Sequence, residues 1–398
     1  MTLELKPLGN SCNLGCTYCY QEPMRLAGNS RASKKYDLDL MMDIADRSGY
    51  NSNYTLFGGE ALLLPKKDLE KVFKRSFEKY GKCGLQTNGT LIDDEHIELF
   101  LKYNVSVGLS IDGPNELNSL RVPVSSKQNV DDLTNKSIEA LKKLSDNDVS
   151  CGIIITVHKV NGTGDNLDRL INFIKWLDTI GIKGGNIHML EIDSKEAEKY
   201  SLTPEENITA FLKLAEFFDN NKHLRYDPFI EMETMVRGDN SKANCIWQSC
   251  DSMNTQAVYG IEGNGQLSNC GMVNKEGIEW TKADNTDYLR DIVLYQTEDK
   301  NGGCKGCPYF IMCNGYCPGS SKNSDWRNKT IYCGTLKKMF SYYENKIEKE
   351  GEIPFSKRPD RYILERTYMD NLMNRGVRLN TLQLIENAKN VRLTIPVK

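Results

Sequence analysis

The chain has 398 residues, enough for two or three domains of ordinary size, and charged residues make up 26% of it and hydrophobic residues 39%. A net charge of −3 argues against a large nucleic-acid-binding surface, and no apolar run approaches the roughly 20 residues that a membrane span needs. The N-terminus lacks an apolar signal region, so we expect a cytoplasmic protein that binds neither nucleic acid nor membrane.

Short apolar segments alternate with helical patterns over residues 1–195. The segments rich in β-branched residues have strand length, and those between them have apolar residues spaced as in amphipathic helices. The strand segments are 54–57, 105–111 and 152–157, and the helical ones include 96–101 and 138–144. This alternation predicts an α/β fold with a parallel sheet, in which ligands bind at the carboxyl ends of the strands.

Beyond residue 195 the composition changes twice. A capping sequence at 203–206 precedes an apolar helical pattern, so we predict a helical bridge over 196–240. From Cys245 to Cys333, Gly, Asn and Cys dominate with little periodicity, which is typical of a region held together by metal. We therefore expect a domain at 1–195, a loop-rich domain at 241–345 and a charged, partly helical extension at 346–398.

The 13 cysteines fall into groups: three lie between Cys12 and Cys19, and eight lie between Cys245 and Cys333. In a reducing cytosol such groups indicate metal ligands or catalytic thiols, not disulfides. Cys83 and Cys151 stand apart and are predicted to be buried core residues. The four histidines have no ligand spacing and are expected to be structural.

The first group has the spacing Cys12-x3-Cys16-x2-Cys19. Three thiolates on one tight loop can bind three irons of a [4Fe–4S] cluster, which leaves the fourth iron without a protein ligand and open to chemistry. A zinc loop is the alternative, but zinc usually takes a fourth Cys or His at short spacing, and none follows here. The spacing therefore predicts a catalytic cluster held by these three cysteines.

With the strand–helix pattern around it, this motif resembles the radical S-adenosylmethionine (SAM) superfamily, over most of residues 5–340. The resemblance implies a partial (β/α)6 TIM-type barrel, with SAM bound to the open iron. Reductive cleavage of SAM would then give a 5′-deoxyadenosyl radical, with electrons from a reductant such as flavodoxin or ferredoxin.

Further residues match the superfamily's SAM contacts. Tyr18 matches the aromatic position that contacts adenine, and Gly58, Gly59 and Glu60 match the GGE motif that receives the methionine amino group. Segments 85–90 and 108–114 resemble the third and fourth strand ends.

Four more residues are candidates for SAM contacts, and for three of them an alternative stays open. Ser110 is the candidate for a polar contact with SAM. Asp112 could contact SAM or be only a turn residue. Met189 and Leu190 could pack on adenine or simply belong to the core.

The second cysteine group contains eight thiols, enough for two [4Fe–4S] clusters, although two zinc sites use the same ligands. In this group, Gly265-x4-Cys270 lies between the pair Cys245 and Cys250 and the cysteines from Cys304 to Cys333. This spacing resembles the SPASM extension of radical SAM enzymes. By that resemblance, one auxiliary cluster is held by Cys245, Cys250, Cys270 and Cys317. The other is held by Cys304, Cys307, Cys313 and Cys333, which brings the expected total to three [4Fe–4S] clusters.

SPASM-type enzymes mostly modify peptides, and two branches compete here. The first is maturation of a ribosomally made (RiPP) precursor peptide by crosslinking, epimerisation or backbone excision. The second is sulfatase maturation, in which Cys or Ser becomes formylglycine. Segments 86–93 and 109–114 look like sulfatase-maturating enzymes, but in those enzymes a catalytic aspartate follows the cysteine of the G-x4-C element. Here Gly271 follows Cys270, so the sequence favours the precursor-peptide branch.

Segment 16–29 also resembles maturases associated with Nif11-type leader peptides, a group that includes spliceases that excise a tyramine unit and leave an α-keto-β-amino acid. Only eleven residues precede Cys12, so no N-terminal leader-binding domain fits, and we expect a separate recognition protein to deliver the peptide. An iron–sulfur electron carrier and a small-molecule radical SAM dehydrogenase are the remaining alternatives.

Overall fold

The structure, a computed structural model, describes residues 2–22, 25, 35–125, 127–248, 250, 257–273 and 288–394. The chain forms two compact units. The first consists of Met1–Glu206, Phe217–Asp227 and Thr255–Lys282, and the second of Asn207–Glu216, Pro228–Asn254 and Ala283–Lys398.

The first unit contains a nine-stranded sheet in the order β7-β6-β5-β4-β3-β2-β1-β8-β9. Strands β1 to β7 follow one another in chain order and are parallel, β8 is parallel to β1, and β9 is antiparallel to β8. The strands are β1 (Thr2–Lys6), β2 (Tyr54–Leu56), β3 (Cys83–Thr87), β4 (Val105–Ser110), β5 (Cys151–Val157), β6 (Gly184–Met189), β7 (Arg225–Asp227), β8 (Val258–Glu262) and β9 (Leu267–Ser268). Because the parallel strands run in one direction, their carboxyl ends share one edge.

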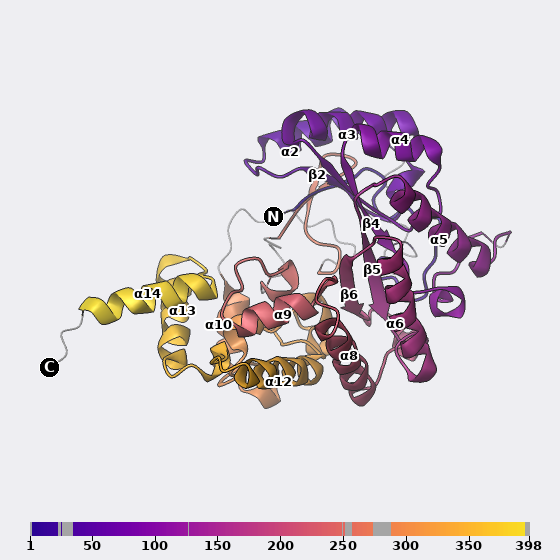
Figure 1. Ribbon diagram of the computed structural model, residues 1–398. Helices are drawn as coiled ribbons and strands as arrows, with labels where there is room; N and C mark the ends of the chain where they lie inside the picture. Colours follow the sequence, from indigo (N-terminus) through magenta and orange to yellow (C-terminus); the bar gives the residue numbers. More distant parts are fainter. Residues whose placement is uncertain are drawn as a thin grey trace. The chain divides into compact units, whose positions relative to one another are not determined.

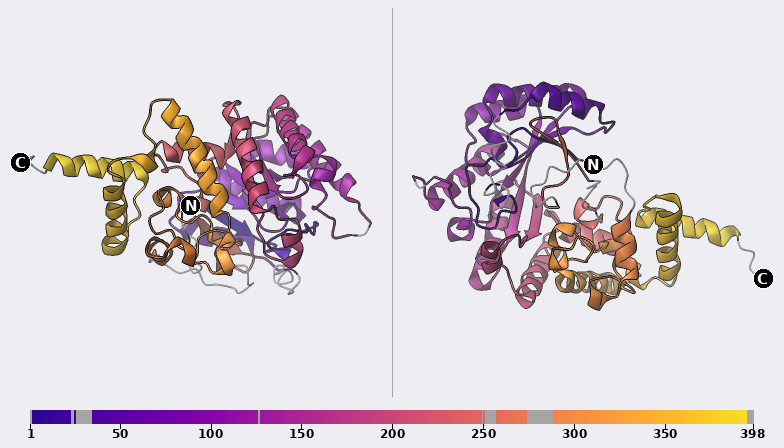
Figure 2. Two further views of the ribbon diagram at one scale, coloured as in Figure 1. Left: turned by 90° about the horizontal axis from the view of Figure 1, so that it is seen from below. Right: turned by 180° about the vertical axis from the view of Figure 1, so that it is seen from behind.

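Amphipathic helices connect these strands and pack along one side of the sheet (Figures 1 and 2). They are α2 (Leu38–Arg47), α3 (Lys66–Tyr80), α4 (Asp94–Lys102), α5 (Val130–Asp146) and α6 (Gly164–Thr179), followed by the short α7 (Lys195–Lys199). The next helix, α8 (Pro204–Asp219), has its residues Asn207–Glu216 in the second unit. Each of α2 to α6 buries one apolar stripe, such as Leu167, Leu170, Ile171 and Ile174 of α6. The repeated strand–helix unit is the α/β partial barrel that the sequence predicts.

The two faces of the sheet differ in their side chains. Alternate residues such as Val107, Leu109, Ile153 and Ile155 are 0–2% exposed under the helices. Apart from Ile154, the residues between them are mostly polar or small and remain at least partly exposed, and they include Thr55, Gln86, Ser106, Thr156, Asn186 and His188. The helices of this unit therefore leave one polar face of the sheet uncovered.

The second unit is mainly helical and rich in loops. Its helices are α9 (Phe229–Val236), α10 (Leu289–Gln296), α11 (Phe310–Cys313), α12 (Cys333–Lys349), α13 (Arg361–Arg375) and α14 (Thr381–Thr394). The last two, yellow in Figure 2, form the extension predicted to be partly helical after residue 346. Among the described residues, no helix combines the length and the apolar character needed to cross a membrane.

Most of the predicted elements are present. The strands expected at 54–57, 105–111 and 152–157 are β2, β4 and β5, and the helical patterns at 96–101 and 138–144 lie in α4 and α5. The capping sequence also forms: the Glu206 N–H donates to Thr203 Oγ1, and the Thr203 N–H donates to the Glu206 carboxylate. The domain boundaries at 195, 240 and 345 stay predictions, and the contacts assign β8 and β9 to the first unit.

Candidate functional site

The loop after β1 carries Cys12, Cys16 and Cys19 at the carboxyl edge of the sheet. Main-chain hydrogen bonds hold this loop against residues 120–124: the N–H groups of Gly15 and Thr17 each donate, over 2.8 Å, to the carbonyls of Val122 and Leu120. The three thiols pack around a small apolar cluster with Leu14 and Leu133. The loop therefore presents its thiols together from a fixed backbone.

The surroundings of these thiols fit an iron–sulfur cluster. N–H donors face the sulfurs, from Leu14 to Cys12 Sγ over 3.4 Å and from Arg25 to Cys19 Sγ over 3.5 Å. Burial raises the pKa of Cys12 to about 11 and that of Cys16 to about 12, so metal binding must displace their protons. In the described part of the chain, no three His, Cys, Asp or Glu groups could hold one metal ion. A cluster does not need such convergence, because each thiolate binds a different iron.

The Gly58–Gly59–Glu60 segment lies directly against the chain that leads into Cys12. The Gly59 N–H donates to the Gly9 carbonyl over 2.9 Å, and the Glu60 N–H donates to the Ser11 carbonyl over 2.8 Å. A Cβ atom at position 59 would collide with the main chain of Ser11, and Gly58 has a φ of +134°. Only glycine permits this approach, which explains the Gly-Gly pair at this distance from the first cysteine.

Glu60 connects that segment to the end of β3. The buried carboxylate accepts hydrogen bonds from Thr87 Oγ1 at 2.7 Å, from the Asn88 N–H at 2.8 Å and from the Leu62 N–H at 3.0 Å. Burial raises the pKa of Glu60, although these three donors oppose the shift. Asn88 in turn donates to Asn13 Oδ1 over 2.9 Å, which ties the same strand end to the cysteine loop.

Tyr18 takes part in a buried polar network centred on Asp112. The Tyr18 hydroxyl donates to Asp112 Oδ2, and Arg121 donates to both carboxylate oxygens, over 3.0 Å from Nε and 3.3 Å from Nη2. The Thr156 N–H donates to Oδ1 over 3.0 Å, and His158 Nε2 lies 3.6 Å from Oδ2. Burial would raise the pKa of Asp112, but Arg121 and His158 outweigh it and hold the pKa well below its usual range.

These contacts bear on the alternative left open for Asp112. The residue is 0% exposed, donors from three other residues reach its carboxylate, and His158 lies beside it. This arrangement favours a structural role over a SAM contact, and we infer that Asp112 is a positioning residue for Tyr18 and for Arg121 beside the cysteine loop. Sequence reasoning missed Arg121 and His158, because neither belongs to a motif and only the fold brings them to Asp112.

The remaining SAM candidates lie at the same edge of the sheet. Ser110 is the last residue of β4 and is partly exposed on the uncovered face. Leu190 packs in a buried cluster with Tyr18, Leu120 and Ala197. Met189 is 5% exposed and alternates with His188 toward the helix-covered side, which favours core packing for Met189.

Tyr20 occupies the space beside Gly271, the position where the sequence lacks the aspartate of sulfatase-maturating enzymes. A Cβ atom at 271 would lie 3.0 Å from Tyr20 Cε2 and 3.6 Å from the Tyr20 hydroxyl oxygen. A side chain at 271 would therefore need the tyrosine ring to shift by a few tenths of an ångström.

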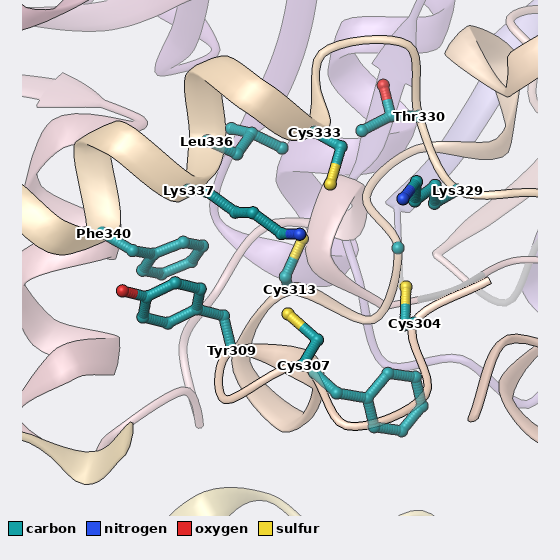
Figure 3. A pocket seen from close by; sticks show the side chains of 12 residues that line it. Cys304, Cys307, Tyr309, Cys313, Lys329, Thr330, Cys333, Leu336, Lys337 and Phe340 are labelled. Carbon is teal, nitrogen blue, oxygen red and sulfur yellow. The ribbon is translucent and has the colours of Figure 1, made fainter. Parts of the chain in front are cut away.

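The second unit brings Cys304, Cys307, Cys313 and Cys333 together around one pocket. Figure 3 shows the four sulfur atoms directed toward a common space, with the Lys337 amine reaching toward it. Burial raises the pKa of Cys304 to about 12 and holds that of Cys313 well above its usual range, so metal binding must displace their protons. These are the four residues predicted to hold one auxiliary cluster, and the donor set fits it.

Lys337 provides a test of this assignment. Its amine donates to Asp299 Oδ1 over 2.9 Å, and the same carboxylate pairs with Lys329 at 2.6 Å, so two cations flank the pocket. We expect Lys337→Met to shift the midpoint potential of this cluster to more negative values, because a nearby positive charge stabilises the reduced form. The potential is measured by titration monitored by electron paramagnetic resonance (EPR). Lys338→Met, an exposed neighbour, is the matched control, and equal potentials in both variants would contradict the assignment.

The four cysteines predicted to hold the other auxiliary cluster are divided between the two units. Cys245, Cys250 and Cys317 belong to the second unit and Cys270 to the first, so this set stays a prediction. Of the cysteines outside both motifs, Cys83 is fully buried and donates to the Tyr54 carbonyl over 3.2 Å, as expected of a core residue, whereas Cys151 is partly exposed.

Comparisons with known proteins agree with this geometry. Residues 7–177 match the family model of the Radical SAM superfamily. Cysteine-type anaerobic sulfatase-maturating enzymes of Clostridium novyi and Clostridium perfringens are both 24% identical to the chain, over 88% and 86% of it and 96% of each enzyme.

Solved structures show the same fold. The structure of anSMEcpe with bound AdoMet and Cp18Cys peptide covers 88% of this chain and 98% of its own, with a TM-score of 0.66 and 20% identity. Streptococcus suis SuiB bound to precursor peptide SuiA covers 71% of this chain and 61% of its own, with a TM-score of 0.50 and 14% identity. Residues 7–177 therefore match the radical SAM domain, and the chain has the α/β fold of radical SAM enzymes.

Proposed function

We propose that this protein is a radical SAM enzyme that abstracts a hydrogen atom from a residue of a peptide substrate. Cys12, Cys16 and Cys19 would hold the catalytic [4Fe–4S] cluster, which with SAM supplies the carbon radical for that abstraction. The observation that carries the proposal is the direct main-chain pairing of the Gly59–Glu60 segment with the residues before Cys12. With the cluster bound, this pairing would keep the motif for the amino acid part of SAM close to it.

The chain's own residues would position the reactants. Glu60 fixes the glycine pair to the end of β3, and Asp112 holds the Tyr18 ring in the loop for contact with adenine. Ser110 and the uncovered polar face of the sheet would meet SAM and the substrate. Eight further cysteines would hold two auxiliary [4Fe–4S] clusters, with the four-thiol pocket of the second unit as one of their sites.

A precursor peptide is our first candidate for the substrate. We prefer it because Gly271 provides no carboxylate directly after Cys270, and because the Tyr20 ring lies in the space beside Gly271. The chemistry would then end in a crosslink, an epimerised residue or a backbone excision. The segment that resembles spliceases, 16–29, lies partly outside the described residues, at 23, 24 and 26–29, so tyramine excision rests on the sequence alone.

Sulfatase maturation is the second candidate, and the similarity to the clostridial enzymes over most of both chains favours it. It requires a proton acceptor other than a residue at 271. The two candidates therefore differ in substrate and in the base that completes the reaction.

Co-expression separates the two. The enzyme is produced with a short peptide encoded beside its gene, or with a sulfatase-derived peptide that contains the target Cys or Ser, and each peptide is weighed by mass spectrometry. A mass change in the precursor peptide that is lost in Cys16→Ala supports the first candidate. Conversion of only the sulfatase peptide to formylglycine would establish the second.

We also propose that a separate small protein delivers the precursor peptide, and that flavodoxin or ferredoxin supplies electrons. In solved structures, anSMEcpe holds a peptide and SuiB holds its precursor peptide SuiA. Tight binding of the leader peptide by this protein alone, measured by calorimetry, would remove the need for the delivery protein.

A further inference from the structure

Arg290, near the start of α10, is fully buried in the second unit and is 0% exposed. Its guanidinium donates hydrogen bonds to five main-chain carbonyls: Nε to Trp326 at 2.6 Å, Nη1 to Asn314 and Tyr316 at 3.0 and 2.9 Å, and Nη2 to Gly315 and Asn328 at 3.3 and 3.1 Å. Carbonyls satisfy the hydrogen bonds of a guanidinium but do not neutralise its charge. A buried cation of this kind needs negative charge nearby.

Three of the five carbonyls belong to the segment between Cys313 and Cys317. Its residues Asn314, Gly315 and Tyr316 all have left-handed backbone conformations, with φ values of 47°, 76° and 64°. Glycine adopts this conformation freely, but it is unfavourable for tyrosine and, to a smaller degree, for asparagine, so a turn that contains both needs outside support. The guanidinium supplies that support, because it binds all three carbonyls at once.

The turn has a consequence for the cysteines at its ends. Cys313 is predicted to bind one auxiliary cluster and Cys317 the other, although only three residues separate them. A run of left-handed residues reverses the chain sharply and lets neighbouring cysteines face different sites. The groups whose negative charge would act on Arg290 are Cys317, its neighbour Asp291, Cys304 and Cys250, so once the thiols bind metal both predicted sets contribute beside Asp291.

We propose that Arg290 is a positioning residue shared by the two predicted auxiliary clusters. Its guanidinium holds the Asn314–Tyr316 turn that assigns Cys313 and Cys317 to different clusters, and its charge compensates the negative charge of both. The proposal rests on the auxiliary clusters of the proposed function, and it adds the residue that separates their ligands.

The test uses the full chain, reconstituted with iron and sulfide without oxygen. Wild type is expected to bind about twelve irons, four for each cluster. Arg290→Met is expected to fall toward about four irons, with retention of the EPR signal of the cluster that responds to SAM. Arg290→Lys keeps the charge but loses the planar fork. We expect it to bind fewer irons or to shift the midpoint potentials of both auxiliary clusters.

Arg327→Met is the matched control, because Arg327 is exposed and pairs with its neighbour Asp325. Iron content and potentials that remain at wild-type values in both Arg290 variants would overturn the proposal. If Arg290→Met yields no soluble protein, wild-type iron content and wild-type midpoint potentials in Arg290→Lys alone would overturn the proposal. If the wild-type protein itself binds only about four irons, the auxiliary clusters do not form, and that part of the proposed function fails. This result differs from failure of the role of Arg290, in which the wild type and both Arg290 variants bind the same number of irons.

Discussion

Arg121→Met is expected to destabilise the first unit and abolish SAM cleavage. Arg121 donates two hydrogen bonds to the fully buried Asp112 carboxylate, and removal of one partner from a buried ion pair costs about 3–5 kcal/mol. The adjacent carbonyls of Leu120 and Val122 accept hydrogen bonds from the cysteine loop, so the damage reaches the cluster ligands. Urea unfolding and the yield of 5′-deoxyadenosine measure the two effects.

Two further variants test whether the unpaired charge of Asp112 causes the loss of stability in Arg121→Met. Arg169→Met removes an exposed pair with Glu116 and should leave both measurements near wild type. Asp112→Asn in the Arg121→Met background should recover part of the stability, because a neutral amide needs no buried counter-charge. If the double variant is no more stable than Arg121→Met, the charge of Asp112 is not the cause of the lost stability.

The effect of Arg121→Met should also depend on pH. Because the pKa of Asp112 is lowered in the folded protein, its pairing stabilises the fold above the unfolded pKa of about 3.9. That contribution is lost as the pH falls through the folded value. The stability difference between wild type and variant should therefore persist at neutral pH and narrow below about pH 4.

Gly59→Ala is expected to lower the rate of SAM cleavage by about 100-fold or more. Its methyl group would collide with the main chain of Ser11 and push the Gly58–Glu60 segment away from the cysteine loop. A displacement of about 1 Å at a catalytic site can cost roughly 100-fold in rate. Iron content should stay near wild type, because the three cysteines themselves are unchanged.

Gly152→Ala is the matched control for this variant. It lies at the amino end of β5, and its Cβ would meet the Gly184 carbonyl at an ordinary 3.6 Å. Its rate of SAM cleavage should remain near wild type. A Gly59→Ala enzyme as active as Gly152→Ala would contradict the view that close backbone pairing sets the SAM site.

The sequence predicts the barrel and its cysteines because these signals are local. The β-branched runs of β4 and β5, the spacing of Cys12, Cys16 and Cys19, and the Gly-Gly pair after β2 each lie within a few residues. Their meaning follows from strand geometry and ligand chemistry without knowledge of distant contacts.

The residues that support the site carry no such signal. Arg121 and Arg290 look like ordinary surface cations in the sequence, yet both are buried by contacts with groups far along the chain or in irregular loops. The same holds for Asp112, whose turn position gives no hint that Tyr18, Thr156 and His158 converge on it. Such roles depend on tertiary contacts that composition and periodicity do not encode.

The most direct test of the account is the fate of SAM on the reduced enzyme. Protein reconstituted and reduced without oxygen is incubated with SAM, and 5′-deoxyadenosine is quantified beside a Cys16→Ala control. We predict that the wild type forms 5′-deoxyadenosine and the control does not. A wild-type enzyme with a full complement of iron that never forms it would contradict the assignment of this site as a radical SAM centre.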